Sequence, residues 1–91
     1  MHIHLGNGVS VPEDEILCLI DLTRQTKDTQ SFLQSLKDMG CTVGREEGSS
    51  TLVLTQRPEE SACRAFLSMI SVATLKARCH HVLDDIRQNT Y

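Results

Sequence analysis

Four histidines and four cysteines carry the most versatile side-chain chemistry in this chain. His2 and His4 share one face of an extended strand and could hold a metal ion if a third ligand approached. His80 and His81 follow Cys79, but adjacent helical residues point about 100° apart, and each histidine has an aspartate four residues later. Surface charge pairing explains the second pair better than metal binding does, and a solvated hairpin face explains the first. We therefore expect no metal site.

No arrangement of side chains suited to catalysis stands out. Cys79 would have to be exposed beside a base to act as a nucleophile, and its place on an apolar helical stripe predicts burial. Gly6-Asn7-Gly8 has no Gly-Lys-Ser/Thr sequence or helix after it, so it predicts a turn and not a phosphate cradle. Paired carboxylates fall in predicted loops or polar helix faces, at Glu46-Glu47, Glu59-Glu60 and Asp84-Asp85. We expect no enzymatic activity, no cofactor and no small-molecule substrate.

The cysteine spacing argues for free thiols. No two cysteines have the two-residue spacing of a zinc knuckle or a redox dithiol. The N-terminus shows no secretory signal, and the longest apolar run, residues 16–20, is too short to cross a bilayer. We expect a cytoplasmic protein without membrane contact whose thiols are small buried hydrophobes, at Cys18, Cys41, Cys63 and Cys79.

Three elements are predicted in the first half of the chain. Alternating residues 2–5 and 9–11 flank the Gly6-Asn7-Gly8 turn, which predicts a β-hairpin. The continuous apolar run 16–20 predicts a strand covered on both faces, and hence a central one. A helix follows, which Thr26 or Asp28 could cap. Its apolar positions and its terminating glycine are Phe32, Leu33, Leu36, Met39 and Gly40.

The second half predicts a hairpin, a strand and a helix. Residues 41–43 and 51–55 are the arms of the predicted hairpin, joined by a polar loop. A turn over 58–61 leads to a last strand over 63–68, and Ser71 is a candidate N-cap for the final helix. One apolar stripe runs along that helix and should cover a sheet or a neighbouring subunit; it comprises Val72, Leu75, Cys79, Val82, Leu83 and Ile86.

Length and composition predict a single small domain over residues 1–91, with the last few residues frayed. Hydrophobic residues make up 40 % of the chain but aromatic residues only 3 %, so the core must be aliphatic. The element order ββ(β)αβββα indicates an α+β fold with a mostly antiparallel sheet of about five to six strands and two helices. A core this small leaves a thin margin of stability, which self-association would improve.

Charge is distributed unevenly along the chain. The net charge is −3, which disfavours strong nucleic-acid or membrane binding by a single copy. All of this net charge lies in residues 1–44, because residues 45–91 hold equal numbers of acidic and basic side chains. Residues 61–83 contain no acid and three bases, Arg64, Lys76 and Arg78. A homo-oligomer would repeat this positive segment around its symmetry axis.

Several segments resemble the small Rem-type extracellular matrix regulators of Gram-positive bacteria, and the B-type member most of all. The resemblance covers most of the chain up to about residue 80; its motifs are 4–9 (HLGNGV), the strand ending at Asp21, 51–55 (TLVLT), 65–68 (AFLS) and 74–78 (TLKAR). It implies a DNA-binding transcriptional regulator that is active as a homo-oligomer and is linked to biofilm matrix genes. It also implies the absence of catalysis and of a cofactor.

The resemblance and the local charge together select the candidate DNA contacts. Where relatives carry basic residues in two loops, this chain has EDE at 13–15 and GSS at 48–50. Contacts must then come from elsewhere: from the closing motif, Lys76 and Arg78, and by local charge Arg64, Arg45 and Arg57.

Two functions remain open at this point. The leading hypothesis is a sequence-tolerant regulator of double-stranded DNA whose salt-sensitive phosphate contacts are repeated by homo-oligomerisation. The alternative is a protein-interaction module that assembles with a larger regulator and does not bind DNA.

Overall fold

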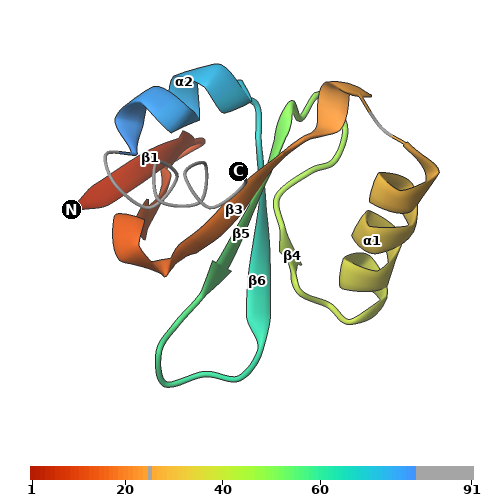
Figure 1. Ribbon diagram of the computed structural model, residues 1–91, viewed down its shortest axis with the longest axis horizontal. Helices are drawn as coiled ribbons and strands as arrows, with labels where there is room; N and C mark the ends of the chain where they lie inside the picture. The colour runs from red at the N-terminus through yellow and green to blue at the C-terminus, as the bar shows by residue number, and fades with distance from the viewer. Residues whose placement is uncertain (25, 80–91) are drawn as a thin grey trace, which may run out of the picture.

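The computed structural model describes residues 1–24 and 26–79, which form six strands and two α-helices (Figure 1). This confirms the predicted α+β class, whereas the expected fraying at the C-terminus concerns residues 80–91 and lies outside the described residues. The elements are β1 (His2–Gly6), β2 (Val9–Pro12), the 3-10 turn η1 (Glu13–Glu15), β3 (Ile16–Asp21), the 3-10 turn η2 (Leu22–Arg24), α1 (Lys27–Asp38), β4 (Thr42–Val43), β5 (Thr51–Gln56), β6 (Cys63–Ser68) and α2 (Val72–Arg78).

The first two strands form the predicted hairpin as a separate two-stranded sheet. Its turn contains three consecutive residues with positive φ, namely 93° at Gly6, 55° at Asn7 and 76° at Gly8. Glycine and asparagine adopt this conformation at low cost, so the local sequence alone specifies the turn.

The other four strands form a second sheet in the order β3-β5-β6-β4. Antiparallel pairing joins β3 to β5 and β5 to β6, but β4 runs parallel to β6. The predicted hairpin of β4 with β5 is therefore wrong. The Cys41 N–H donates to the Leu36 carbonyl at the end of α1, and the Cys41 carbonyl accepts from the Ala65 N–H, so the end of the helix holds β4 beside β6.

The central position predicted for β3 is also wrong, because β3 is an edge strand of this sheet. Both of its faces are nevertheless covered: Ile16 and Leu19 pack beneath the β1–β2 hairpin and α2, and Ile20 packs on the side of α1. Apolar residues on both faces of a strand require cover above and below the sheet. They do not require a strand on each side.

Capping residues begin and end the helices as the sequence predicts. Thr26 caps α1, and its hydroxyl accepts from the Thr29 N–H at 3.2 Å. Gly40 ends that helix with a φ of 72°. Ser71 caps α2 by accepting from the Thr74 N–H at 3.2 Å. None of the helices in residues 1–24 and 26–79 has the length and apolar character of a membrane-crossing segment.

Two apolar clusters cover the two faces of the four-stranded sheet. Figure 1 shows α1 on one side of this sheet and the β1–β2 hairpin with α2 on the other. On the hairpin face, defined by Leu19, Val53 and Phe66, the β1–β2 hairpin and α2 supply the cover. On the α1 face, defined by Ile20, Leu52 and Ala65, the cover is α1 through Leu33 and Leu36. Of the stripe predicted along the final helix, Leu75 and Cys79 are buried and Val72 is half-buried, whereas Val82, Leu83 and Ile86 lie outside the described residues.

Candidate nucleic-acid interface

The last turn of α2 carries Lys76 and Arg78, the two bases taken from the closing motif. Leu75 and Cys79 bury the inner side of the helix, so Lys76 and Arg78 are exposed at its flanks. Arg78 bends toward β1, where its Nη1 donates to the His4 carbonyl oxygen at 3.0 Å. This bond joins the end of α2 to the first strand and fixes one side of the guanidinium group.

Arg78 shares a shallow hollow with both N-terminal histidines. The hollow has a volume of about 350 Å³, and Met1, His2, Ile3, His4 and Arg78 line it. None of these five residues is acidic. We name the surface formed by His2, His4 and Arg78 the α2–β1 surface. Lys76 lies on the other flank of α2, about 200° around the helix axis from Arg78.

The sequence predicts a solvated hairpin face for His2 and His4 and no part in DNA binding. Both are exposed, as expected from the strict alternation along β1. Their proximity to Arg78 had no signal in the sequence, because only the packing of α2 against β1 brings these distant segments together. The other pair, His80 and His81, lies outside the described residues.

Two other candidate bases lie at the β5–β6 turn and are already paired with acids. The Glu60 carboxylate lies 3.6 Å from Nη1 of Arg57 and 3.5 Å from Nη2 of Arg64. Arg57 also lies 4.0 Å from the Glu15 carboxylate. These pairs are exposed and each contributes little stability, but together they offset much of the positive charge at this end of the sheet.

Arg64 and α2 are separated by the length of β6. Arg64 is the second residue of that strand and α2 begins beyond its far end, so at about 3.3 Å per residue the strand holds them well apart. The positive segment that is continuous in the sequence is thus divided between two places in the fold.

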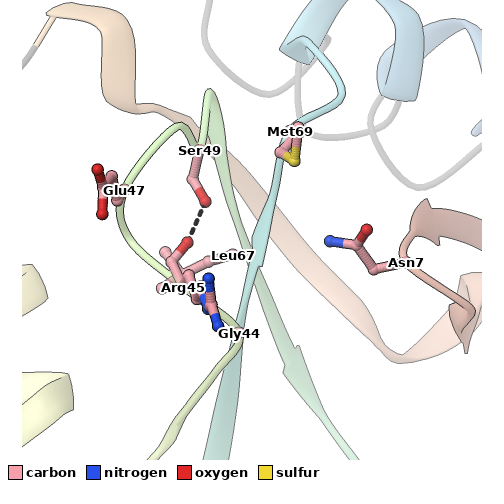
Figure 2. A pocket seen from close by; sticks show the side chains of 7 residues that line it. All are labelled: Asn7, Gly44, Arg45, Glu47, Ser49, Leu67 and Met69. Atoms are coloured by element: carbon pink, nitrogen blue, oxygen red, sulfur yellow. Dashed lines mark hydrogen bonds between the residues drawn. The ribbon is translucent and has the colours of Figure 1, made fainter.

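Arg45 occupies a third location, in the cleft shown in Figure 2. The cleft has a volume of about 470 Å³ and lies between the turn of the β1–β2 hairpin at Asn7 and the loop that follows β4. The Ser49 hydroxyl donates to the Arg45 carbonyl and braces this loop. Glu47 lines the same cleft, and Figure 2 shows its side chain on the other side of the loop from that of Arg45.

The histidine, cysteine and acidic side chains of residues 1–24 and 26–79 form no group of three that could hold a metal ion. The four cysteines are free thiols, and the predicted burial is complete only for Cys79, which is 6 % exposed; the other three are half-buried. Burial, followed by the charge of Cys63, raises the pKa of the Cys18 thiol. Burial, followed by the charge of Glu13, raises the pKa of the Cys79 thiol. Both thiols are therefore poor nucleophiles at neutral pH.

Raising the pH from 7 to 10 is expected to lower the free energy of unfolding through these two thiols. Their pKa values are raised in the folded protein, whereas an unfolded chain has the ordinary value of about 8.5. Their contribution is complete below that value and is lost as the pH rises through the raised values, at about 1.4 kcal/mol for each unit of difference. Urea unfolding followed by circular dichroism measures the loss.

The double variant Cys18→Ala/Cys79→Ala serves as the control for other groups that titrate above pH 8. It should lose less stability than the parent protein between pH 7 and pH 10. Equal losses in the two proteins would contradict the assignment to these thiols.

Comparison with known proteins identifies no family for this chain. A scan against models of protein families finds no match to the chain, and no curated protein matches it significantly.

Proposed function

We propose that this protein is a DNA-binding transcriptional regulator that acts as a homo-oligomer in the cytoplasm and contacts the phosphates of double-stranded DNA. The observation that carries the proposal is the α2–β1 surface, where the exposed Arg78 lies beside two histidines, with Lys76 exposed on the other flank of the same helix. No acidic residue occurs in the sequence between residues 61 and 79, and the acid whose charge reaches the end of α2 is Glu13, which acts on Cys79.

The hydrogen bond of Arg78 to His4 orients its guanidinium group and leaves other N–H groups available for a phosphate. One of its N–H groups is held by the His4 carbonyl, and an arginine has five N–H donors, so several remain to contact a phosphate. A side chain that is already oriented loses less conformational entropy on binding than a free one. Lys76 adds a second cation on the same helical turn.

Oligomerisation compensates for the unfavourable total charge. A single copy with net charge −3 and two phosphate contacts would bind weakly. Linked copies multiply the effective affinity because the second contact forms at high local concentration. The resemblance of the 74–78 segment to Rem-type regulators places these bases in the closing motif, and it suggests biofilm matrix genes as the targets.

Mobility-shift assays with duplex DNA test this function. We expect a complex at micromolar protein near 50 mM salt, weakening steeply as salt rises because each phosphate contact contributes about −0.9 to the slope of log K against log salt. Lys76→Glu should lower the affinity at least tenfold and reduce the slope by about one for each copy. Absence of any complex at 50 mM salt, or binding that is undiminished at high salt, would overturn the proposal.

Arg57→Glu is the matched control because it makes the same change of charge at the β5–β6 turn, where Glu15 and Glu60 already surround the base. It should weaken DNA binding much less than Lys76→Glu does. Arg64→Glu and Arg45→Glu extend the comparison to the remaining candidate bases. Equal losses in all four variants would indicate a general charge effect with no role for the bases of α2.

The alternative function is a protein-interaction module that assembles with a larger regulator without binding DNA. The ion pairs of Arg57 and Arg64, together with the acidic η1 turn, favour this alternative, because they leave few free cations outside α2. A protein that forms an oligomer in solution but gives no DNA complex in the mobility-shift assay would support this alternative.

A further inference from the structure

The outer edge of β3 is an unusual feature of this fold. Among residues 1–24 and 26–79 only β5 pairs with β3. The Leu22 N–H donates to the Ser50 carbonyl, and the register continues with Ile20 opposite Leu52. Because backbone groups alternate along a strand, Cys18 and Ile20 face β5, and the N–H groups of Leu19 and Asp21 point outward.

This edge lacks the protection usual for an exposed strand. Edge strands commonly carry lysine or proline, which discourage pairing with another chain. Here five apolar residues, 16–20, are followed by Asp21, with no basic residue and no proline. The only irregularity is a bulge between Ile16 and Cys18, and it leaves the segment from Cys18 to Asp21 regular.

We propose that a second copy of this chain pairs with β3 in antiparallel orientation about a two-fold axis, with Leu19 opposite Leu19 of the second copy. The pairing joins two four-stranded sheets into one continuous sheet. On the hairpin face it brings the two Leu19 side chains together, and on the α1 face it brings Cys18 against Ile20 of the second copy.

Charges at the two ends of the strand favour this partner and this register. Asp14 lies in η1 just before β3, and Arg24 lies in η2 just after it. Both are exposed, and neither forms an ion pair within the described part of the chain. A two-fold axis at Leu19 brings Asp14 of one copy toward Arg24 of the other at both ends of the new pair.

The neighbouring register is disfavoured. An axis at Cys18 would place Asp21 opposite Glu15 of the second copy, and like charges directly opposite each other destabilise a strand pair. The sheet's other edge, β4, has only two residues and offers few backbone groups. The longer antiparallel edge is thus the better site for self-pairing. It provides the self-association that the proposed function requires, and it does not depend on DNA binding.

Three apolar side chains with equal exposure allow a matched test by light scattering without DNA. Leu17 beside the β3 edge, Phe32 on α1 and Val43 on β4 are each 40 % exposed. In the proposed register Leu17 lies opposite Asp21 of the second copy, so Leu17→Glu should introduce repulsion and halve the molar mass at a concentration where the parent protein is paired. Phe32→Glu and Val43→Glu should leave the mass unchanged.

Three outcomes would overturn the proposal. They are a parent protein that stays monomeric at a concentration of about 100 μM, a molar mass for Leu17→Glu equal to that of the parent, and loss of association in Val43→Glu, which would assign pairing to the β4 edge. Circular dichroism verifies that each variant is folded. A paired protein that fails to shift DNA would contradict the proposed function and leave this inference intact, so the two failures are distinguishable.

A charge exchange tests the register independently. Asp14→Arg and Arg24→Asp should each raise the dissociation constant of the pair several-fold, because each places like charges together at both ends. The double variant Asp14→Arg/Arg24→Asp should restore the parent value. Additive weakening in the double variant would contradict the antiparallel register centred on Leu19.

Discussion

Replacing Leu75 with alanine is expected to lower the free energy of unfolding by about 3 kcal/mol, within the range of 2 to 5 kcal/mol found for buried leucines. Leu75 is 1 % exposed and is the buried residue of α2, where it packs in the same cluster as Ile3 and Val53. Its loss removes apolar burial and leaves a cavity between the helix and the sheet. Urea unfolding followed by circular dichroism gives the value, and an effect below 1 kcal/mol would contradict the assigned packing.

The same substitution should weaken DNA binding, because α2 positions Lys76 and Arg78. Leu36→Ala is the matched control: Leu36 is 3 % exposed and anchors α1 on the opposite face of the sheet. Both variants should lose similar stability, but under conditions where both are folded only Leu75→Ala should lose DNA affinity. Equal loss of affinity in the two variants would show that general destabilisation is the cause.

Replacing Ser68 with alanine is expected to cost about 2 to 4 kcal/mol although it removes a single oxygen atom. It leaves the buried Leu5 carbonyl and the half-buried Ile70 N–H unpaired, and a fully buried unpaired group costs about 1 to 3 kcal/mol. Ser68 is 1 % exposed. Its hydroxyl donates to the Leu5 carbonyl at 2.7 Å and accepts from the Ile70 N–H at 3.0 Å. The residue therefore links the four-stranded sheet to β1 and to the segment leading into α2. Chemical denaturation measures the cost.

Thr51 provides the comparison, because it lies directly opposite Ser68 across the β5–β6 pair. Its hydroxyl donates to the Ile70 carbonyl at 2.7 Å, so the two side chains hold both backbone groups of Ile70. Thr51→Val keeps the shape of the side chain, leaves only the Ile70 carbonyl unpaired and should lower the free energy of unfolding less than Ser68→Ala does. The double variant Thr51→Val/Ser68→Ala should cost less than the sum of the two single costs, since both substitutions remove a hydrogen bond to Ile70. Strict additivity, or a cost for Ser68→Ala below 0.5 kcal/mol, would contradict this account.

Local structure was predictable wherever neighbouring residues specify it. The first hairpin follows from Gly6-Asn7-Gly8, and the helix starts follow from Thr26 and Ser71, because positive φ angles and capping hydrogen bonds depend on residues close in sequence. The exposure of the candidate bases on α2 was also predictable from residues close in the sequence. Their exposure follows from the apolar side of the helix that Leu75 defines.

Strand order and the final arrangement of charge were not predictable in this way. The apolar run of β3 specifies only that both faces of the strand are covered. In this fold the two helices and the β1–β2 hairpin provide that cover although β3 is an edge strand, so the run does not determine the position of β3 in the sheet. The parallel pairing of β4 with β6 depends on the two backbone hydrogen bonds by which Cys41 joins Leu36 at the end of α1 to Ala65 in β6.

The sequence by itself determined the elements, their caps and the excess of positive charge in the segment that ends in α2. Only the tertiary structure decided that Arg78 binds the His4 carbonyl and that Arg64 lies apart from α2, beside Glu60. It also decided that β3 is an edge strand of the four-stranded sheet. The physical reason is that capping and turn formation depend on contacts between near neighbours in the chain. Strand order and charge clustering depend instead on which distant apolar faces pack together, and several pairings would bury the same residues.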